Sequence, residues 1–148
     1  MSEDIKLEKF DQVGIVVNNI EKSAEMYREL FSFKGDINIV EQDANVIYKG
    51  KNVTFKMKKI MQFFGGKQFE VVEVISADGP NLYSEFIEQG NTGLHHIGIY
   101  VKSADKYIHK FKDKFDVDVA QIGHVGKLKF TYLDTKDSLG YYIELIEF

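Results

Sequence analysis

The chain alternates segments of period-two hydrophobicity with segments in which apolar residues recur every three or four positions. Residues 10–17 (FDQVGIVV) alternate and are rich in valine and isoleucine, which predicts a strand. Residues 20–31 carry apolar side chains at helical spacing, and the asparagine pair before them can cap the helix. Short β-type runs between 36 and 58 follow, and then a clear strand over 67–75. The first half of the chain therefore predicts one strand, one helix and three further strands.

The same pattern returns further along the chain. The segment FDQVGIVVNNIEKSAEMYRELF at 10–31 is matched by LHHIGIYVKSADKYIHKFKDKF at 94–115, through both the strand and the helix. Residues 78–91 lie between the two copies and predict a turn with a short connecting helix. Internal repeats of this kind indicate two supersecondary units that must cover each other's hydrophobic faces.

We therefore predict an α+β fold in which two βαβββ modules form curved sheets around a shared cavity. The first module spans about residues 8–77 and the second spans 92–148. Together they make a single domain over 1–148, which is long enough to bury one sizeable core.

The composition narrows the classes of function. The net charge is −4 and Arg28 is the one arginine, which argues against a nucleic-acid surface. The one local basic cluster consists of Lys56, Lys58 and Lys59. It is either a solvated strand edge or loop, or a binding site for an anionic part of a substrate. The chain has no cysteine, so thiol catalysis and cysteine-based zinc sites are excluded. We find neither a signal peptide nor a membrane-length apolar run, and we expect a cytoplasmic protein without nucleic-acid or membrane partners.

Four polar residues occupy equivalent positions in the repeat. Gln12 and His96 stand at the head of the two repeated strands, and Glu70 and Glu144 lie in the strands that close the two modules (EVVEV and ELIEF). Two carboxylates held close together need a compensating cation. Three oxygen donors and one imidazole suit a divalent ion such as Zn²⁺, Ni²⁺, Co²⁺ or Mn²⁺. The repeat therefore predicts one divalent metal site at these four residues.

Each repeated strand also carries a glycine two positions after its polar residue, at Gly14 and Gly98. Since alternate side chains of a strand face one way, these glycines lie beside the polar residues and leave room at the floor of the cavity. The same rule places His95 on the opposite face of its strand from His96. His124 lies in a glycine-flanked turn, from which it can reach the mouth of the site.

Three segments carry a resemblance to a known family. DQVGIVVNNIEKSAEMYREL, GLHHIGIYV and LDTKDSLGYYIELIE resemble the first strand and helix, the central strand and the closing strand of the vicinal oxygen chelate superfamily. This group includes the glyoxalases and the methylmalonyl-CoA epimerases, and the resemblance covers nearly the whole chain. It implies paired βαβββ modules and places the family's metal ligands at Gln12, Glu70, His96 and Glu144.

The resemblance also implies a reaction. Its shared chemistry is metal-assisted proton abstraction next to a carbonyl, of the lactoylglutathione lyase or the methylmalonyl-CoA epimerase type, on a small carbonyl or thioester substrate. Glu144 is the expected base and Glu70 is the alternative. A homodimer is expected from the same resemblance.

Within the superfamily, the sequence resembles the epimerases in one respect and glyoxalase I in another. The overall sequence is closest to the epimerases, but these carry His where Gln12 stands and an acidic residue on a middle strand near Thr54. The set Gln, Glu, His, Glu is similar to that of some glyoxalase I enzymes, which hold glutathione partly through arginines. A small-molecule binding or resistance protein of the same fold is an alternative. A metal-dependent dioxygenase is a less favoured one, because those enzymes use two histidines and one carboxylate.

Overall fold

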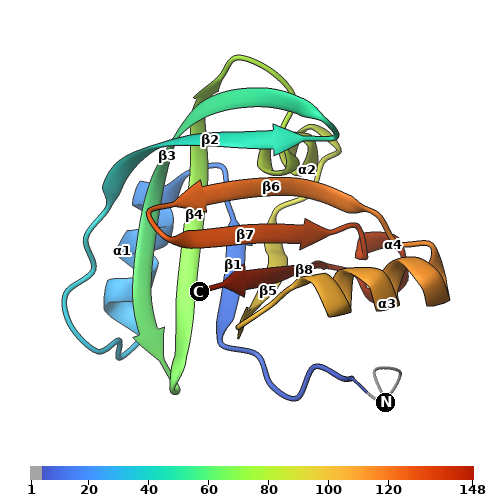
Figure 1. Ribbon diagram of the computed structural model, residues 1–148. Coiled ribbons are helices and arrows are strands. Elements are labelled where there is room, and N and C mark those ends of the chain that lie inside the picture. The colour runs from blue at the N-terminus through green and yellow to red at the C-terminus, as the bar shows by residue number, and fades with distance from the viewer. Residues whose placement is uncertain (1–4) are drawn as a thin grey trace.

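The computed structural model describes residues 5–148, which form an eight-stranded barrel with four helices (Figure 1). In chain order the elements are β1 (Gln12–Val16), α1 (Ile20–Leu30), β2 (Val40–Tyr48), β3 (Lys51–Phe64), β4 (Lys67–Ala77), α2 (Leu82–Glu88), β5 (Gly93–Val101), α3 (Asp105–Phe115), β6 (Val119–Val125), β7 (Leu128–Leu133), α4 (Lys136–Leu139) and β8 (Tyr142–Glu147). The order of one strand, one helix and three strands occurs twice, with the short α4 inserted before the last strand. The predicted α+β fold is confirmed.

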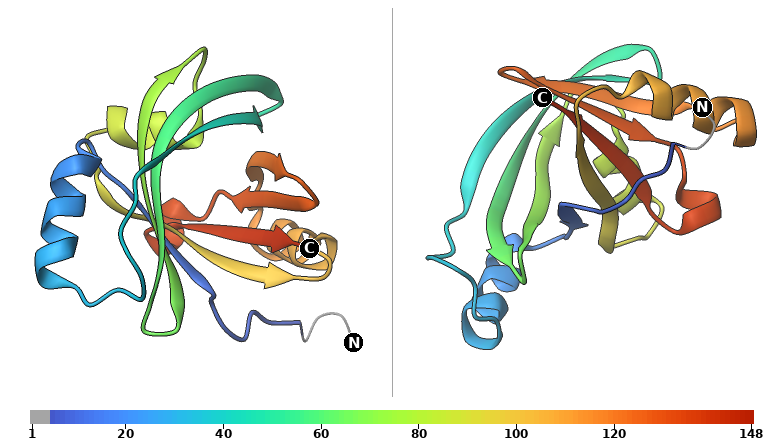
Figure 2. Two further views of the ribbon diagram at one scale, coloured as in Figure 1. Left: turned by 90° about the vertical axis from the view of Figure 1, so that its left-hand side faces the viewer. Right: turned by 60° about the horizontal axis from the view of Figure 1, so that its bottom comes forward.

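The strands follow the order β1-β4-β3-β2-β6-β7-β8-β5 around a closed barrel. β1 is parallel to β4, and β5 is parallel to β8, so the first and last strands of each half lie side by side. The two halves join where β1 runs antiparallel to β5 and where β2 runs antiparallel to β6. Strands of one chain therefore enclose the interior, and their curvature is visible in Figure 2.

The two long helices cover the outside of the barrel, each on its own half (Figure 1). α1 buries Ile20 and Ala24 against Ile60 and Val71 of the neighbouring strands. α3 lies against a second cluster, formed by Ile99, Val101, Ala104, Leu133, Ile143 and Leu145. Among the described residues, no helix is both long enough and apolar enough to cross a membrane.

Side chains fix the start of α1 against the barrel. Asn19 caps the helix by accepting a hydrogen bond from the backbone N–H of Lys22, as its position in the sequence predicts. The Glu73 carboxylate of β4 accepts the backbone N–H of Ile20 at 2.8 Å. These contacts satisfy N–H groups that have no partner within the helix, and they tie the helix to the strand next to β1.

Most of the barrel interior is an apolar core that includes α2. The cluster contains Val16, Val46, Tyr48, Val53, Phe55, Met57, Val72, Leu82, Tyr83, Phe86, Ala120 and Tyr132. The backbone N–H of Leu82, at the start of α2, donates to the buried Gln121 side chain of β6 at 2.9 Å. α2 is thus fixed to the barrel, and its side chains form part of the wall next to the polar residues of the interior.

Candidate metal centre

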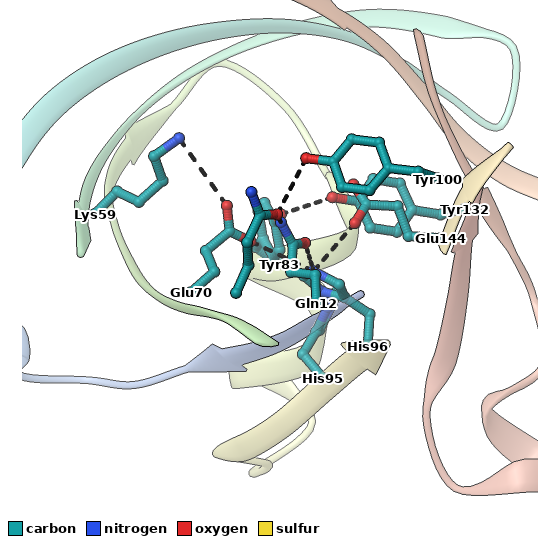
Figure 3. A network of polar contacts seen from close by, with 10 residues as sticks. Gln12, Lys59, Glu70, Tyr83, His95, His96, Tyr100, Tyr132 and Glu144 are labelled. Carbon is teal, nitrogen blue, oxygen red and sulfur yellow. Dashed lines mark hydrogen bonds and ion pairs between the residues drawn. The ribbon is translucent and has the colours of Figure 1, made fainter. Parts of the chain in front are cut away.

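The structure brings all four repeat-related polar residues together inside the barrel (Figure 3). His96 Nε2 lies 3.2 Å from Gln12 Oε1, 3.3 Å from Glu70 Oε1 and 3.4 Å from Glu144 Oε1. The residues come from β1, β4, β5 and β8, which are adjacent around the barrel. All four are buried, with exposed fractions from 0% to 8%.

Two glycines make this close approach possible. A Cβ atom on Gly14 would stand 2.0 Å from His96 Cε1, and a Cβ atom on Gly98 would stand 2.9 Å from Glu144 Oε1. Neither glycine has a left-handed backbone, so the requirement is space. The prediction that these glycines leave room beside the polar residues is correct.

The prediction that His95 faces away from His96 is wrong. β5 contains a bulge against β1, because Gly14 pairs with His96 while Ile15 pairs with Leu94. His95 is the extra residue, and side-chain alternation breaks down at a bulge. Both histidines are fully buried, and their Nδ1 atoms are 2.9 Å apart.

The hydrogen bonds around Gln12 determine which end of its amide faces the cluster. Gln12 Nε2 donates to Gln68 Oε1 at 3.2 Å, and the Tyr100 hydroxyl donates to the same oxygen at 3.1 Å. The Gln68 oxygen accepts both bonds, so the Gln12 carbonyl oxygen is the end directed at His96. Gln12 therefore presents an oxygen ligand.

The two glutamates differ in their electrostatic surroundings. Burial raises the pKa of Glu144 to about 7, and repulsion from Glu70 adds to this while His96 opposes it. Burial also acts to raise the pKa of Glu70, but the hydrogen bond and charge of His96, together with Lys59, hold that pKa below its ordinary value. Lys59 Nζ is 4.0 Å from Glu70 Oε2. The two equivalent carboxylates therefore have different proton affinities.

Burial and the same two glutamates shift the pKa values of the His96 imidazole and of two tyrosine hydroxyls. Burial lowers the pKa of His96, but Glu144 and Glu70 outweigh it and raise that pKa overall. Burial raises the pKa of Tyr83 and of Tyr132 well above the ordinary value, with the two glutamates adding to it, and their hydroxyls are 2.8 Å apart. The tyrosines are thus neutral hydrogen-bonding groups beside the carboxylates.

A cavity of about 300 Å³ opens onto this cluster. Its lining includes Gln12, Glu70 and Glu144, together with Lys59 and an apolar wall formed by Val46, Phe55, Met57, Phe130 and Tyr132. His124 also lines the cavity, but it belongs to β6 and does not lie in a turn as predicted. A larger hollow of about 600 Å³ between the end of β4 and α2 contains none of the four clustered residues. The interior cavity is therefore the candidate site.

Residues 11–132 match the family described as the Glyoxalase/Bleomycin resistance protein/Dioxygenase superfamily. The chain belongs to this superfamily. Its members commonly bind a divalent metal ion, and many are enzymes, although the same fold also serves proteins without enzymatic activity. A search of curated proteins gave no significant match.

Solved structures with the superfamily's fold cover nearly the whole chain. A hypothetical protein of Bacillus halodurans has a TM-score of 0.68 and 22% identity, covering 95% of this chain and 94% of that chain. Methylmalonyl-CoA epimerase of Mycobacterium tuberculosis has a TM-score of 0.62 and 16% identity, with coverage of 99% and 95%. A methylmalonyl-CoA epimerase variant of Streptomyces coelicolor, in complex with 2-nitronate-propionyl-CoA, has a TM-score of 0.57 and 20% identity, with coverage of 96% and 98%. At these identities the similarity shows the fold.

The donor atoms of the cluster fit a divalent ion in chemistry and in their contacts with His96. An ion that binds nitrogen and oxygen at about 2.0–2.2 Å separates neighbouring donors by about 2.8–3.6 Å, which includes the three distances to His96 Nε2. Glu144 Oε1 is buried without a hydrogen bond. Within the described residues, however, no three His, Cys, Asp or Glu side chains are arranged as a complete metal site. A metal ion would therefore satisfy the free oxygen, but the two carboxylates must adjust to share it.

The cavity-facing positions of β3 differ from the pattern expected of a superfamily epimerase. Thr54 is exposed, bonds to Asn45 on the neighbouring strand and is not among the residues that line the cavity. The residues of β3 that line the cavity are Phe55, Met57, Lys59 and Met61. None of these is acidic, and Lys59 places a positive charge on the strand.

Proposed function

We propose that the chain binds one divalent metal ion at Gln12, Glu70, His96 and Glu144 and catalyses proton abstraction next to a carbonyl group. The observation that carries the proposal is the buried pair of glutamates around one imidazole at the wall of an open cavity. Two carboxylates in such a setting favour a bound cation. The bound ion would supply Lewis-acid stabilisation of the negative charge that develops on a substrate oxygen.

Glu144 is the better candidate for the base. In the metal-free protein its pKa is about 7, so of the two glutamates it has the higher affinity for a proton. Glu70, whose pKa is held below its ordinary value, stays ionised and is a weaker proton acceptor. Glu70 is thus suited to holding the cation, and it remains the alternative base because its carboxylate faces the same cavity.

Lys59 supports a substrate that carries a negative charge. Lys59 is the one lysine among the described residues that line the cavity, and its side chain is 19% exposed. An ammonium group next to a carboxylate-rich site can hold an anionic group of the substrate beside the reacting carbonyl. Acyl-CoA thioesters and glutathione hemithioacetals both belong to the candidate substrates. We propose thioesters first, which the fold shared with an epimerase in complex with a CoA ligand supports.

The decisive experiment follows exchange of the substrate α-proton with deuterated solvent by NMR, after metal analysis of protein purified without chelators. Wild-type protein should contain about one divalent ion per chain and should catalyse exchange. The Glu144→Gln variant should lose about two to four orders of magnitude in rate. Glu147→Gln, on the same strand but partly exposed, is the matched control and should behave as wild type.

The possible outcomes separate the rival functions. Exchange by Glu144→Gln at the wild-type rate would assign the base to Glu70, to be tested by Glu70→Gln. Absence of both metal and exchange would favour a small-molecule binding protein, for which the apolar wall of the cavity is suitable. A dioxygenase would instead consume oxygen with Fe²⁺, which an oxygen electrode detects. The homodimer stays a prediction, and light scattering at micromolar concentration tests it.

A further inference from the structure

His95 contacts His96 of the cluster but does not line the cavity. Its ring is fully buried and packs between aromatic side chains, with centroid distances of 4.8 Å to Tyr83, 4.9 Å to Phe86 and 5.0 Å to Tyr142. No carboxylate is among the contacts found for this ring. A charged imidazolium would be unfavourable in such surroundings, so His95 is neutral and has one donor and one acceptor nitrogen.

The hydrogen-bond partners assign those two nitrogens. His95 Nε2 faces the backbone carbonyl oxygen of Leu82 at 3.5 Å, and His95 Nδ1 faces His96 Nδ1 at 2.9 Å. A carbonyl oxygen can only accept, so Nε2 is the donor nitrogen of His95. His95 Nδ1 must then be the acceptor, and His96 Nδ1 must carry the proton that it accepts.

A proton on His96 Nδ1 is not the position that the oxygens around His96 Nε2 would favour. Oxygens of Gln12, Glu70 and Glu144 all lie within 3.4 Å of His96 Nε2. Unless a carboxyl is protonated, these oxygens can only accept a hydrogen bond from His96 Nε2. They would therefore favour the tautomer of a neutral His96 that carries its single proton on Nε2. A proton at that atom blocks the lone pair that a metal ion needs.

We propose that His95 is a positioning residue that holds the proton of His96 on Nδ1 and thereby keeps His96 Nε2 available as a metal ligand. The chain of groups runs from the Leu82 carbonyl through His95 to His96, so α2 takes part in arranging the site. Outer hydrogen bonds of this kind fix the ring orientation and the tautomer of metal-binding histidines. The inference rests on the proposed metal function, but its central claim concerns protons that are observable without metal.

The direct test is nitrogen-15 NMR of the imidazole rings, before and after addition of Zn²⁺. His95 should carry its proton at Nε2 in both states, and His96 should keep its Nδ1 proton in both states while Nε2 changes on zinc addition. Spectra of the variants described next assign the signals. A proton on His95 Nδ1 would overturn the inference.

Calorimetric titration with Zn²⁺ supplies the second readout. His95→Phe keeps an aromatic ring but removes the acceptor, and it should weaken zinc binding about 10- to 100-fold. His95→Asn offers an oxygen near the position of Nδ1 and should recover most of the affinity, while the exposed His109→Asn should match wild type. Thermal unfolding followed by circular dichroism checks that each variant is folded.

The outcomes distinguish this inference from the proposed function. Equal losses of affinity in folded His95→Phe and His95→Asn would show a packing role and overturn the inference. If wild type binds no zinc, the metal function fails, while the NMR spectra still decide the proton positions. If His95→Phe does not fold, the asparagine variant and the wild-type spectra decide the matter.

Discussion

Replacing Glu144 by glutamine should change how the stability of the metal-free protein depends on pH. The pKa of this carboxyl rises from 4.5 to about 7, chiefly because it is buried. Between these two values the unfolded chain ionises while the folded chain keeps its proton. The stabilisation that the raised pKa provides is therefore complete below about pH 4.5 and is lost as the pH rises through about 7.

The size of the effect follows from the shift. Each pKa unit corresponds to about 1.4 kcal/mol, so the metal-free wild type should lose about 3 kcal/mol of unfolding free energy across this window through Glu144 alone. The Glu144→Gln variant lacks this titration. His96 and Glu70 still titrate in both proteins, but glutamine also removes a charge that raises the pKa of His96. The difference between the two pH profiles therefore reports Glu144 together with its coupling to His96.

Urea unfolding in the presence of a chelator, followed by circular dichroism at pH 5 and pH 8, measures this difference. The wild type should lose about 2.5 kcal/mol more than Glu144→Gln between the two pH values, since the unfolded carboxyl is already mostly ionised at pH 5, and Glu147→Gln should follow the wild type. Parallel profiles within about 1 kcal/mol would refute the reasoning, because the buried carboxylate would then cost little. Zinc at about 100 times its dissociation constant should restore about 2.7 kcal/mol to the wild type at pH 8, and less to the glutamine variant.

Three further outcomes are expected. Zinc affinity, measured by calorimetry, should fall at least about 25-fold from pH 7.5 to pH 5.5, since the carboxyl with a pKa of about 7 must release its proton to bind the ion, and His96, whose pKa is raised, must release one as well. An affinity unchanged over this range would exclude that carboxyl as a ligand. Gly14→Ala should displace the His96 ring, reduce unfolding free energy by about 1–3 kcal/mol and weaken zinc binding, whereas Gly79→Ala, whose new methyl has only ordinary contacts, should do neither. Lys59→Met should raise KM for an anionic substrate more than it lowers kcat, and Lys58→Met, which removes a surface pair with Glu21, should leave KM unchanged; equal effects of the two variants would remove Lys59 from the substrate site.

The repeat made the cluster predictable from the sequence. Gln12 and His96 occupy equivalent strand positions, as do Glu70 and Glu144. They come together because the strands that carry them, β4, β1, β5 and β8, are neighbours where the two halves join. The sequence also predicts that Lys59 points inward. Positions 55, 57 and 59 share one face of the strand, and Phe55 and Met57 on that face are buried, whereas Lys56 and Lys58 lie on the outer face. Treating the three lysines as one cluster hid this difference.

The role of His95 could not be obtained in the same way. Alternation assigns neighbouring residues to opposite faces, and it fails at a bulge, whose position depends on how β1 and β5 pair. The partner at the other nitrogen is a backbone carbonyl of α2, and nothing in a local pattern says where a connecting helix docks. Tyr83 of the same helix was missed for the same reason, although it adjoins His96 and Tyr132. Both depend on contacts between segments far apart in the chain.

The environments of Glu70 and Glu144 show how the two halves of the repeat have become different. Lys59 pairs with the residue two positions after Glu70, and Phe130 pairs with the residue two positions after Glu144, so lysine and phenylalanine occupy equivalent places in the two halves. Burial acts to raise the pKa of both glutamates. The hydrogen bond and charge of His96, and to a smaller extent Lys59, bring the pKa of Glu70 below its ordinary value. Burial prevails at Glu144 and raises its pKa to about 7. A symmetric site would give two carboxylates of equal proton affinity and no preferred base. The hydrogen bond of His96 to Glu70, with the shorter reach of Lys59 to that carboxylate, therefore keeps Glu70 ionised and leaves Glu144 with the higher proton affinity.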